Sequence, residues 1–267
     1  MKITVKVGSS TLTHESGNLN IRRIEKLVKV LSDLKNAGHE IVLVSSGAIA
    51  MGLGKLHLHT KPDDVQGKQA AAAVGQCELI HIYDKLFTEY NHVVAQLLLT
   101  GEDFDHTDRL NNLSNTLFKL FEYDVIPIIN ENDSTCTSEI SVGDNDSLSA
   151  LVAKTVGSDL LILLSDIDGL YDGDPRQNPN AEFISVVEEI TPAIEALGGA
   201  AGSNRGTGGM ATKIHAAKMA TEAGMDMVVA NGRRPEILYD IVENKRVGTR
   251  FMAVNKIDDM KLTPRSV

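Results

Sequence analysis

The stretch Leu160-Leu-Ile-Leu-Leu164 is apolar at every position, and Ile41-Val-Leu-Val44 repeats this pattern earlier in the chain. Strands with one face in water alternate apolar and polar side chains, whereas strands covered on both faces are continuously apolar. The two runs therefore indicate central strands of a parallel sheet with helices on both sides. Similar apolar runs predict the strands Ile3–Val7, Ile41–Ser45, Val93–Leu99, Val125–Ile129, Leu160–Leu164 and Met227–Ala230.

Helical patterns separate most of these strands. Between the first two, apolar residues recur at helical spacing from Ile21 to Ala37, and the pattern stops at Gly38, a common residue after a helix. Strands that alternate with helices predict an α/β fold: an open, mainly parallel β-sheet sandwiched between helices in three layers, α/β/α. We expect one domain over residues 1–253 and a peripheral C-terminal tail over 254–267.

Composition narrows the class of partner. The chain has 267 residues, 42% hydrophobic and 23% charged, which is typical of a globular protein. A formal net charge of −10 and only 4% aromatic residues argue against a nucleic-acid partner. No apolar run suits a signal peptide or a membrane span, and Cys77 and Cys136 are too few for a disulfide framework. We therefore expect a cytoplasmic protein that binds no membrane and takes a small anionic substrate.

Glycine and serine motifs follow the first two predicted strands. Ligands of open α/β sheets bind at the carboxyl ends of the strands. Lys6-Val-Gly-Ser-Ser10 places a lysine beside a turn whose N–H groups can cradle phosphate, and Ser45-Ser-Gly-Ala48 can open a helix that receives a carboxylate. Each motif alone is also consistent with an ordinary turn or a serine N-cap. Two such turns on neighbouring strands favour a binding site.

Two further loops are dense in Asp and Asn. Asn130-Glu-Asn-Asp133 follows a predicted strand, and Gly143-Asp-Asn-Asp-Ser147 opens a helix predicted at Leu148–Val156. Such side chains often only cap turns, but the second loop holds more polar groups than capping requires. An aspartate there can orient lysines or magnesium, and Asp133 can pair with a ligand ammonium group.

The last two motifs suit a nucleotide. Ser165-Asp-Ile-Asp-Gly-Leu-Tyr171 directly follows an apolar strand, and it is either a charged turn or a nucleotide-contacting loop. Gly206-Thr-Gly-Gly-Met-Ala-Thr-Lys213 leads into a helix predicted at Ile214–Ala223, so its backbone can approach phosphate with a lysine at the helix start. It does not fit the P-loop pattern, because Thr212 precedes the lysine, nor the dinucleotide pattern, because no strand precedes it.

In this order and combination, the six motifs resemble the glutamate 5-kinases of the amino acid kinase superfamily, over Lys2 to Ala253. The resemblance implies an amino acid kinase domain over residues 1–253. It also implies ATP-dependent phosphorylation of the side-chain carboxylate of L-glutamate to L-glutamyl 5-phosphate, the first step of proline biosynthesis. Many family members carry a C-terminal PUA domain, and we expect none here, because the sequence ends soon after Phe251.

The resemblance also implies roles for single residues. Lys6, Asp146 and Lys213 would be catalytic, with the aspartate holding both lysines against the ATP phosphates. Glutamate would be bound by Ser46, Asp133, Asn145 and Asn130. ATP would be contacted by Lys6, Gly8, Ser165, Asp166, Thr207, Gly208, Gly209, Met210, Ala211, Thr212 and Lys213. Magnesium would be carried by ATP without direct protein ligands, proline is a candidate feedback inhibitor, and the family implies a homo-oligomer.

Two alternatives stay open. A kinase of the same superfamily that acts on N-acetylglutamate, aspartate or a nucleoside monophosphate would keep the fold, although Asp133 suits a free ammonium group better. A catalytically silent amino acid sensor would keep the fold and a ligand site. The joint presence of Lys6, Asp146 and Lys213 argues against such a sensor.

Overall fold

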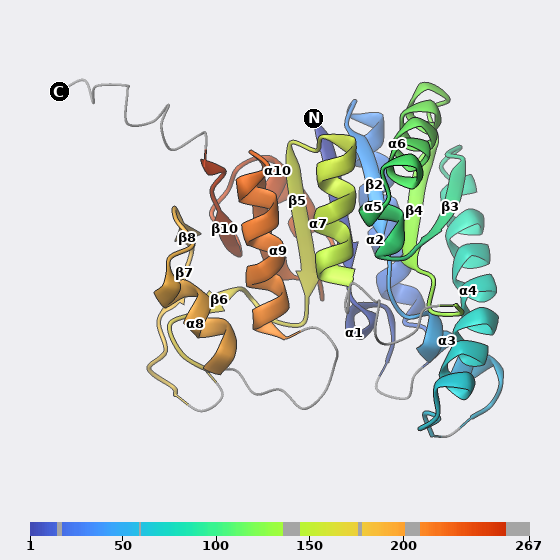
Figure 1. Cartoon of the computed structure of the whole chain (residues 1–267), viewed down its shortest axis with the longest axis horizontal. Helices are drawn as coiled ribbons and strands as arrows, with labels where there is room; N and C mark the ends of the chain where they lie inside the picture. The colour runs from blue at the N-terminus through green and yellow to red at the C-terminus, as the bar shows by residue number, and fades with distance from the viewer. Residues whose placement is uncertain (15–17, 59, 136–144, 176–177, 201–208, 255–267) are drawn as a thin grey trace.

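A computed structural model of the chain has an eight-stranded sheet between two layers of helices (Figure 1). It describes all residues except 15–17, 59, 136–144, 176–177, 201–208 and 255–267. Its strands run in the order β3-β4-β2-β1-β5-β9-β10-β8. They span β1 Lys2–Val7, β2 Glu40–Val44, β3 Val94–Leu99, β4 Ile126–Glu131, β5 Leu160–Ser165, β8 Val186–Val187, β9 Asp226–Asn231 and β10 Thr249–Phe251.

All six predicted strands are present, and their mainly parallel pairing is confirmed. β1 pairs in parallel with β2 on one side and with β5 on the other, so the direction of strand addition reverses at β1. At such a switch point the ligand site lies at the carboxyl ends of the strands. β10 runs antiparallel to β9, and β6 (Leu170–Tyr171) and β7 (Phe183–Ile184) form a separate antiparallel pair. The sequence patterns missed β6, β7, β8 and β10, because two or three residues are too short to display a period.

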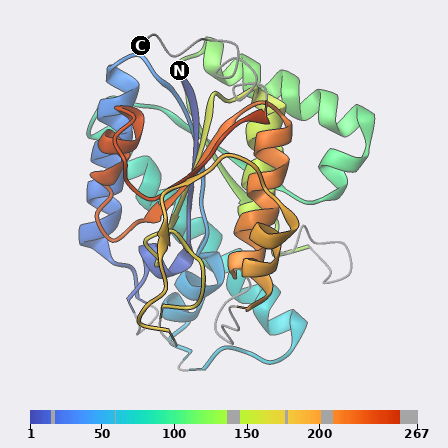
Figure 2. The ribbon, with the colours of Figure 1, turned by 90° about the vertical axis from the view of Figure 1, so that its left-hand side faces the viewer.

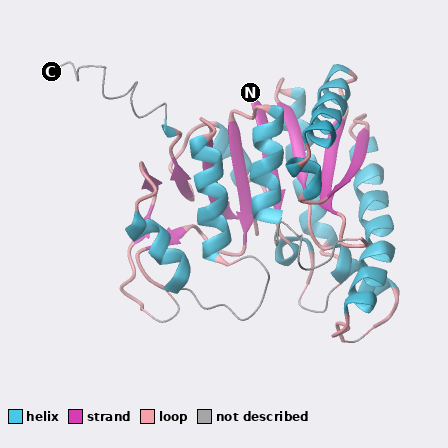
Figure 3. Cartoon of the chain, in the orientation of Figure 1, coloured by secondary structure: helices cyan, strands magenta, loops and turns pink. Residues whose placement is uncertain are grey.

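Helices cover both faces of the sheet, which confirms the three-layer prediction (Figures 2 and 3). On one face, residues of α2, α4 and α10 share a buried apolar cluster with β1. On the other face, α6, α7 and α9 pack against the sheet in two further clusters. The helices are α1 Ser9–Leu12, α2 Ile21–Asn36, α3 Ala48–Lys55, α4 Val65–Thr88, α5 Glu102–Asp105, α6 Thr107–Glu122, α7 Asn145–Val156, α8 Pro192–Ala200, α9 Met210–Glu222 and α10 Ile237–Val242.

The central strand β5 explains why its sequence has no polar positions. Leu160, Ile162 and Leu164 point into the cluster shared with α2, whereas Leu161 and Leu163 point into the cluster under α9. All five side chains are buried. Because successive residues of a strand face opposite sides, each layer of helices needs its own set of apolar side chains.

The helices α3 and α4 cross in close contact through glycines. A Cβ atom on Gly52 would lie 1.8 Å from the carbonyl oxygen of Ala71, and one on Gly75 would lie 1.8 Å from that of Ala48. Only glycine allows two backbones to approach this closely. α3 begins directly after the Ser45-Ser-Gly47 turn, so the crossing fixes that turn relative to α4.

Within the described ranges, no helix combines the length and apolar character needed to cross a bilayer. The predicted C-terminal tail falls almost wholly on residues 255–267, outside the described residues.

Candidate active site

Lys6, Asp146 and Lys213 meet at the carboxyl end of β1. The Nζ atom of Lys6 lies 2.5 Å from Oδ1 of Asp146, and Nζ of Lys213 lies 3.0 Å from Oδ2 of the same carboxylate. The carboxylate is fully buried, and the two lysine side chains are only 10% and 6% exposed. A buried carboxylate between two ammonium groups holds both cations at one place in the fold.

Each member of this cluster comes from a different element. Lys6 lies on the face of β1 opposite Ile3, Val5 and Val7, as predicted, and therefore points toward α7 and α9. Asp146 lies in the first turn of α7, which begins at Asn145 and not at Leu148 as predicted. An acidic side chain is stabilised near the positive end of a helix dipole, so the helix extends into the polar loop.

The glycine-rich motif also differs from the prediction at its end. α9 begins at Met210, so Lys213 lies one turn inside the helix and not at its start. Met, Ala and Lys are strong helix formers, and Gly209 is the last glycine before them. Oγ1 of Thr212 lies 3.0 Å from Oδ2 of Asp146, which adds a hydroxyl contact to the cluster. The predicted ATP ligands Thr207 and Gly208 lie outside the described residues.

The electrostatics of Asp146 follow from this arrangement. Burial by itself would raise the pKa of the carboxyl group. The charges and hydrogen bonds of Lys6 and Lys213 outweigh burial and hold the pKa of Asp146 below its ordinary value. The aspartate is therefore ionised throughout the neutral range, and it cannot serve as a proton donor there.

A second polar cluster lies beside the first, around Asn145. Its Nδ2 atom donates to Oγ of Ser46 at 2.7 Å, to the carbonyl oxygen of Ser45 at 3.1 Å and to Oδ1 of Asn130 at 3.1 Å. The structure thus brings together Ser46, Asn130 and Asn145, three of the four residues predicted to bind glutamate. Because Asn145 and Asp146 are consecutive, the two clusters share the first turn of α7.

Two residues of this second cluster were missed by the sequence analysis. Gln76 of α4 accepts from Nδ2 of Asn130 at 2.8 Å, and the hydroxyl of Tyr83 lies 3.0 Å from Oγ of Ser45. Both side chains are buried. A glutamine within the otherwise apolar run Ala71-Ala-Ala-Val-Gly-Gln76 was the available signal, since a buried polar side chain needs a partner.

Asp133, the fourth predicted glutamate ligand, lies in the turn after β4 and is half-buried. Burial raises the pKa of its carboxyl group, and the nearby charge of Lys61 offsets this only in part. A carboxylate in this environment gains from a cationic partner.

The predicted nucleotide contacts on β1 and β5 lie at adjacent strand ends. Gly8 donates its N–H to the carbonyl oxygen of Leu164 at 3.3 Å, which joins the two strand ends. Ser165 is the last residue of β5 and is buried, while Asp166 is exposed and accepts from the Ser165 hydroxyl at 3.1 Å. Gly209, Met210, Ala211 and Thr212 enter the site region from the start of α9.

The buried carboxylate of the lysine cluster faces two ammonium groups, so its charge is already balanced by the protein. Among the described residues, no three His, Cys, Asp or Glu side chains come close enough to hold a metal ion.

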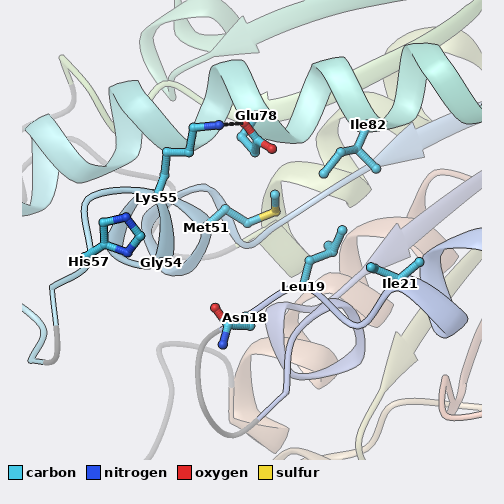
Figure 4. Close-up of a pocket in the computed structure, with 9 residues that line it drawn as sticks. All are labelled: Asn18, Leu19, Ile21, Met51, Gly54, Lys55, His57, Glu78 and Ile82. Carbon is cyan, nitrogen blue, oxygen red and sulfur yellow. Dashed lines mark hydrogen bonds and ion pairs between the residues drawn. The ribbon is translucent and has the colours of Figure 1, made fainter.

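A separate cavity of about 590 Å³ opens between the helices α3 and α4 on one side and the segment 18–21 on the other (Figure 4). Leu19, Met51 and Ile82 line it, as do Lys55 and Glu78, which form an ion pair at 2.8 Å. None of the predicted site residues lines this cavity. The chemistry described above therefore lies elsewhere, at the strand ends.

Comparison with known proteins agrees with this geometry. A family model described as the amino acid kinase family matches residues 1–231. A glutamate 5-kinase of Clostridium perfringens (strain 13 / Type A) is 56% identical over 256 residues, which cover 94% of this chain and 95% of that protein. A glutamate 5-kinase of Caldanaerobacter subterraneus subsp. tengcongensis is 51% identical over 263 residues, 98% of this chain and 71% of that protein.

Solved structures are similar in fold. Carbamate kinase from Giardia lamblia bound to AMP-PNP superimposes with a TM-score of 0.67 at 15% identity, over 94% of this chain and 98% of that one. The T. acidophilum isopentenyl phosphate kinase product complex gives a TM-score of 0.65 at 17% identity, over 94% and 100%. At such identities the likeness concerns the fold alone, and it confirms the predicted amino acid kinase fold.

Proposed function

This chain belongs to the amino acid kinase family and, within it, to the glutamate 5-kinases, and we propose that it phosphorylates the side-chain carboxylate of L-glutamate with ATP. The product is L-glutamyl 5-phosphate, and the reaction opens proline biosynthesis. The observation that carries the proposal is the pair of adjacent clusters at the strand ends. Two buried lysines on Asp146 suit phosphate, and the cluster around Asn145 suits an amino acid.

In the proposed mechanism the lysine cluster aligns and neutralises the transferring group. A carboxylate oxygen of glutamate attacks the γ-phosphorus, the bond from that phosphorus to the bridging oxygen breaks, and ADP leaves with the electron pair. Lys6 and Lys213 balance the charge on the phosphoryl oxygens, and Asp146 keeps the two ammonium groups in place. Glutamate is already ionised near neutral pH, so no general base is needed.

Bound magnesium would supply positive charge that neutralises the phosphates of ATP. In this proposal the protein holds the ion through the nucleotide. Lys6, Gly8, Lys213 and the start of α9 bind the phosphates, while Ser165 and Asp166 contact the rest of the nucleotide.

Glutamate recognition is assigned to the second cluster. Ser46 and Asn145 would bind the amino acid, with Asn130 beside them. Asp133 would pair with the α-ammonium group, since its half-buried carboxylate gains from a cation. An acetylated amino acid has no α-ammonium group, so in this proposal the pair with Asp133 makes the enzyme prefer free glutamate.

We also propose a setting for the enzyme. It works in the cytoplasm as a homo-oligomer. Proline, which resembles cyclised glutamate, competes near Ser46 and Asp133. Titration of proline at low glutamate tests that competition. An unchanged rate of glutamate phosphorylation at millimolar proline would show that proline does not compete.

The direct test of the function is glutamate-dependent turnover. Purified protein with ATP and magnesium should release ADP only when L-glutamate is added, and hydroxylamine should trap the acyl phosphate as a hydroxamate. ADP release without a hydroxamate would mean simple ATP hydrolysis, and the proposal would then be wrong.

A further inference from the structure

Helix α4 carries two buried polar side chains that reach the glutamate cluster from the opposite side to α7. Gln76 is 8% exposed and Tyr83 is fully buried. They lie two helical turns apart, so they project from the same face of α4. One meets the end of β4 at Asn130, and the other meets the end of β2 at Ser45.

The contact with Gln76 fixes the orientation of the Asn130 amide. The backbone N–H of Glu131 donates to Oδ1 of Asn130 at 2.9 Å, so this oxygen cannot turn away without losing a donor. Nδ2 of Asn130 must then face Gln76, whose Oε1 accepts at 2.8 Å. A buried N–H without an acceptor is costly, so the acceptor on Gln76 is what makes this orientation stable.

The orientation of Asn130 in turn fixes Asn145. The Oδ1 atom of Asn130 and the carbonyl oxygen of Ser45 can only accept, and Nδ2 of Asn145 lies 3.1 Å from each. The nitrogen of Asn145 must therefore face them, and its Oδ1 faces the other way. That oxygen is buried and has no hydrogen-bond partner among the described residues. An acceptor held in this way suits the donor hydrogens of an amino acid.

Tyr83 holds Ser45 at the end of β2, as Gln76 holds Asn130 at the end of β4. The phenol oxygen of Tyr83 lies 3.0 Å from Oγ of Ser45, which in turn lies 3.3 Å from the carbonyl oxygen of Ser46. Burial raises the pKa of Tyr83 far above its ordinary value of 10.0, so the phenol stays protonated and keeps its hydrogen bond with Ser45. The phenol thereby holds the turn that carries Ser46.

We propose that Gln76 and Tyr83 are positioning residues that hold the glutamate site in its binding geometry. Gln76 acts through Asn130 on the carbonyl oxygen of Asn145, and Tyr83 acts through Ser45 on the hydroxyl of Ser46. The close crossing of α3 and α4 fixes the distance of α4, and so of both side chains, from the turn that precedes α3. This inference rests on the proposed function, and it adds residues that the site motifs do not contain.

Substitutions on α4 test the inference, because they should change the KM for glutamate but not the KM for ATP. Gln76→Met keeps the size but removes the acceptor, and we expect the KM for glutamate to rise about tenfold with the KM for ATP within about twofold. Gln76→Glu restores an acceptor and should recover part of the loss. Tyr83→Phe removes one oxygen and should raise the KM for glutamate about threefold or more.

The matched control is Thr4→Val. It removes one hydroxyl from the buried pair of Thr4 and Ser158, which lie 2.8 Å apart at the other end of the sheet. This variant should lose stability comparable with Tyr83→Phe but keep both KM values. Should Gln76→Met fail to fold, Tyr83→Phe still decides the matter, because it leaves the packing nearly intact.

The outcomes separate the inference from the function it rests on. Without glutamate-dependent turnover by the unaltered enzyme, the proposed function fails, and the inference falls with it. With turnover present, a KM for glutamate within about twofold of the unaltered enzyme in both Gln76→Met and Tyr83→Phe would overturn the inference alone. A rise in both KM values together would also overturn it, since that pattern indicates general damage.

Discussion

The ammonium group of Lys6 lies 2.5 Å from Oδ1 of Asp146, although the two residues are far apart in the sequence, on β1 and α7. The same carboxylate binds Lys213 of α9 through its second oxygen. One buried aspartate thus sets the distance between two cations. The arrangement of cations is the property that phosphoryl transfer depends on most.

Removal of either lysine should therefore impair catalysis. We expect Lys213→Ala and Lys6→Ala each to lower kcat/KM by about 10²-fold or more, as is usual for a single electrostatic contact to a transition state. Steady-state kinetics with saturating magnesium measures this. Lys218→Ala is the control, because Lys218 lies on the same helix but pairs with Glu195 at the surface. Activity of Lys213→Ala within about twofold of the unaltered enzyme would refute the assigned role.

Asp146→Asn should destabilise the fold as well as the reaction. It leaves two buried ammonium groups without their counter-charge, and breaking a buried pair in this way costs about 3–5 kcal/mol. Urea unfolding gives the free energy. Asp240→Asn, which breaks an exposed pair with Lys245, should cost less than about 1 kcal/mol. Equal losses in the two variants would contradict the account.

The pH dependence of that stability has a definite sign. The pKa of Asp146 is lower in the folded protein than its ordinary value of 3.8, so its contribution is complete above about pH 4. The contribution disappears as the pH falls through the lowered pKa. The difference in the free energy of unfolding between Asp146→Asn and the unaltered protein should therefore become smaller in acid, as urea unfolding at several pH values would measure.

Glutamate binding should weaken as the pH falls, because Asp133 becomes protonated. Burial raises the pKa of this carboxyl group above its ordinary value of 3.8, so it becomes protonated at a higher pH than an exposed aspartate. A protonated Asp133 cannot pair with the ammonium group, and the KM for glutamate should rise as the pH falls. Asp133→Asn should have a high KM that changes less with pH. Parallel pH profiles for the two proteins would exclude this role.

The α3–α4 crossing predicts opposite effects for two glycines. Gly75→Ala places a Cβ atom 1.8 Å from the carbonyl oxygen of Ala48 and should destabilise the protein by about 1–3 kcal/mol or more. Gly54→Ala, in α3, meets its nearest atom at 3.4 Å and should be neutral or slightly stabilising, because alanine favours helices. Thermal unfolding compares them, and a neutral Gly75→Ala would contradict the close crossing.

The sequence was sufficient for the parts of the fold and site that depend on local pattern. Continuous apolar runs predicted β2 and β5, and Lys6 was placed on the correct face of β1 because side chains alternate along a strand. The helix α9 begins at Met210, earlier than predicted. The glycines directly before Met210 disfavour a helix, so the sequence pattern becomes helical only after them. The partners of Gln76 and Tyr83 could not be predicted, because they lie far away in the sequence and only tertiary packing brings them together.

The central claim is that this enzyme phosphorylates free L-glutamate, and substrate comparison tests it most directly. L-glutamate, N-acetylglutamate and L-aspartate are compared by coupled ADP release under the same ATP and magnesium concentrations. Asp133 would lose its ammonium partner with N-acetylglutamate, and a broken buried pair costs about 3–5 kcal/mol, so kcat/KM should fall by roughly 10²–10⁴-fold. Aspartate is one methylene shorter and should lose kcat more than binding. Equal or faster turnover of N-acetylglutamate would contradict the account.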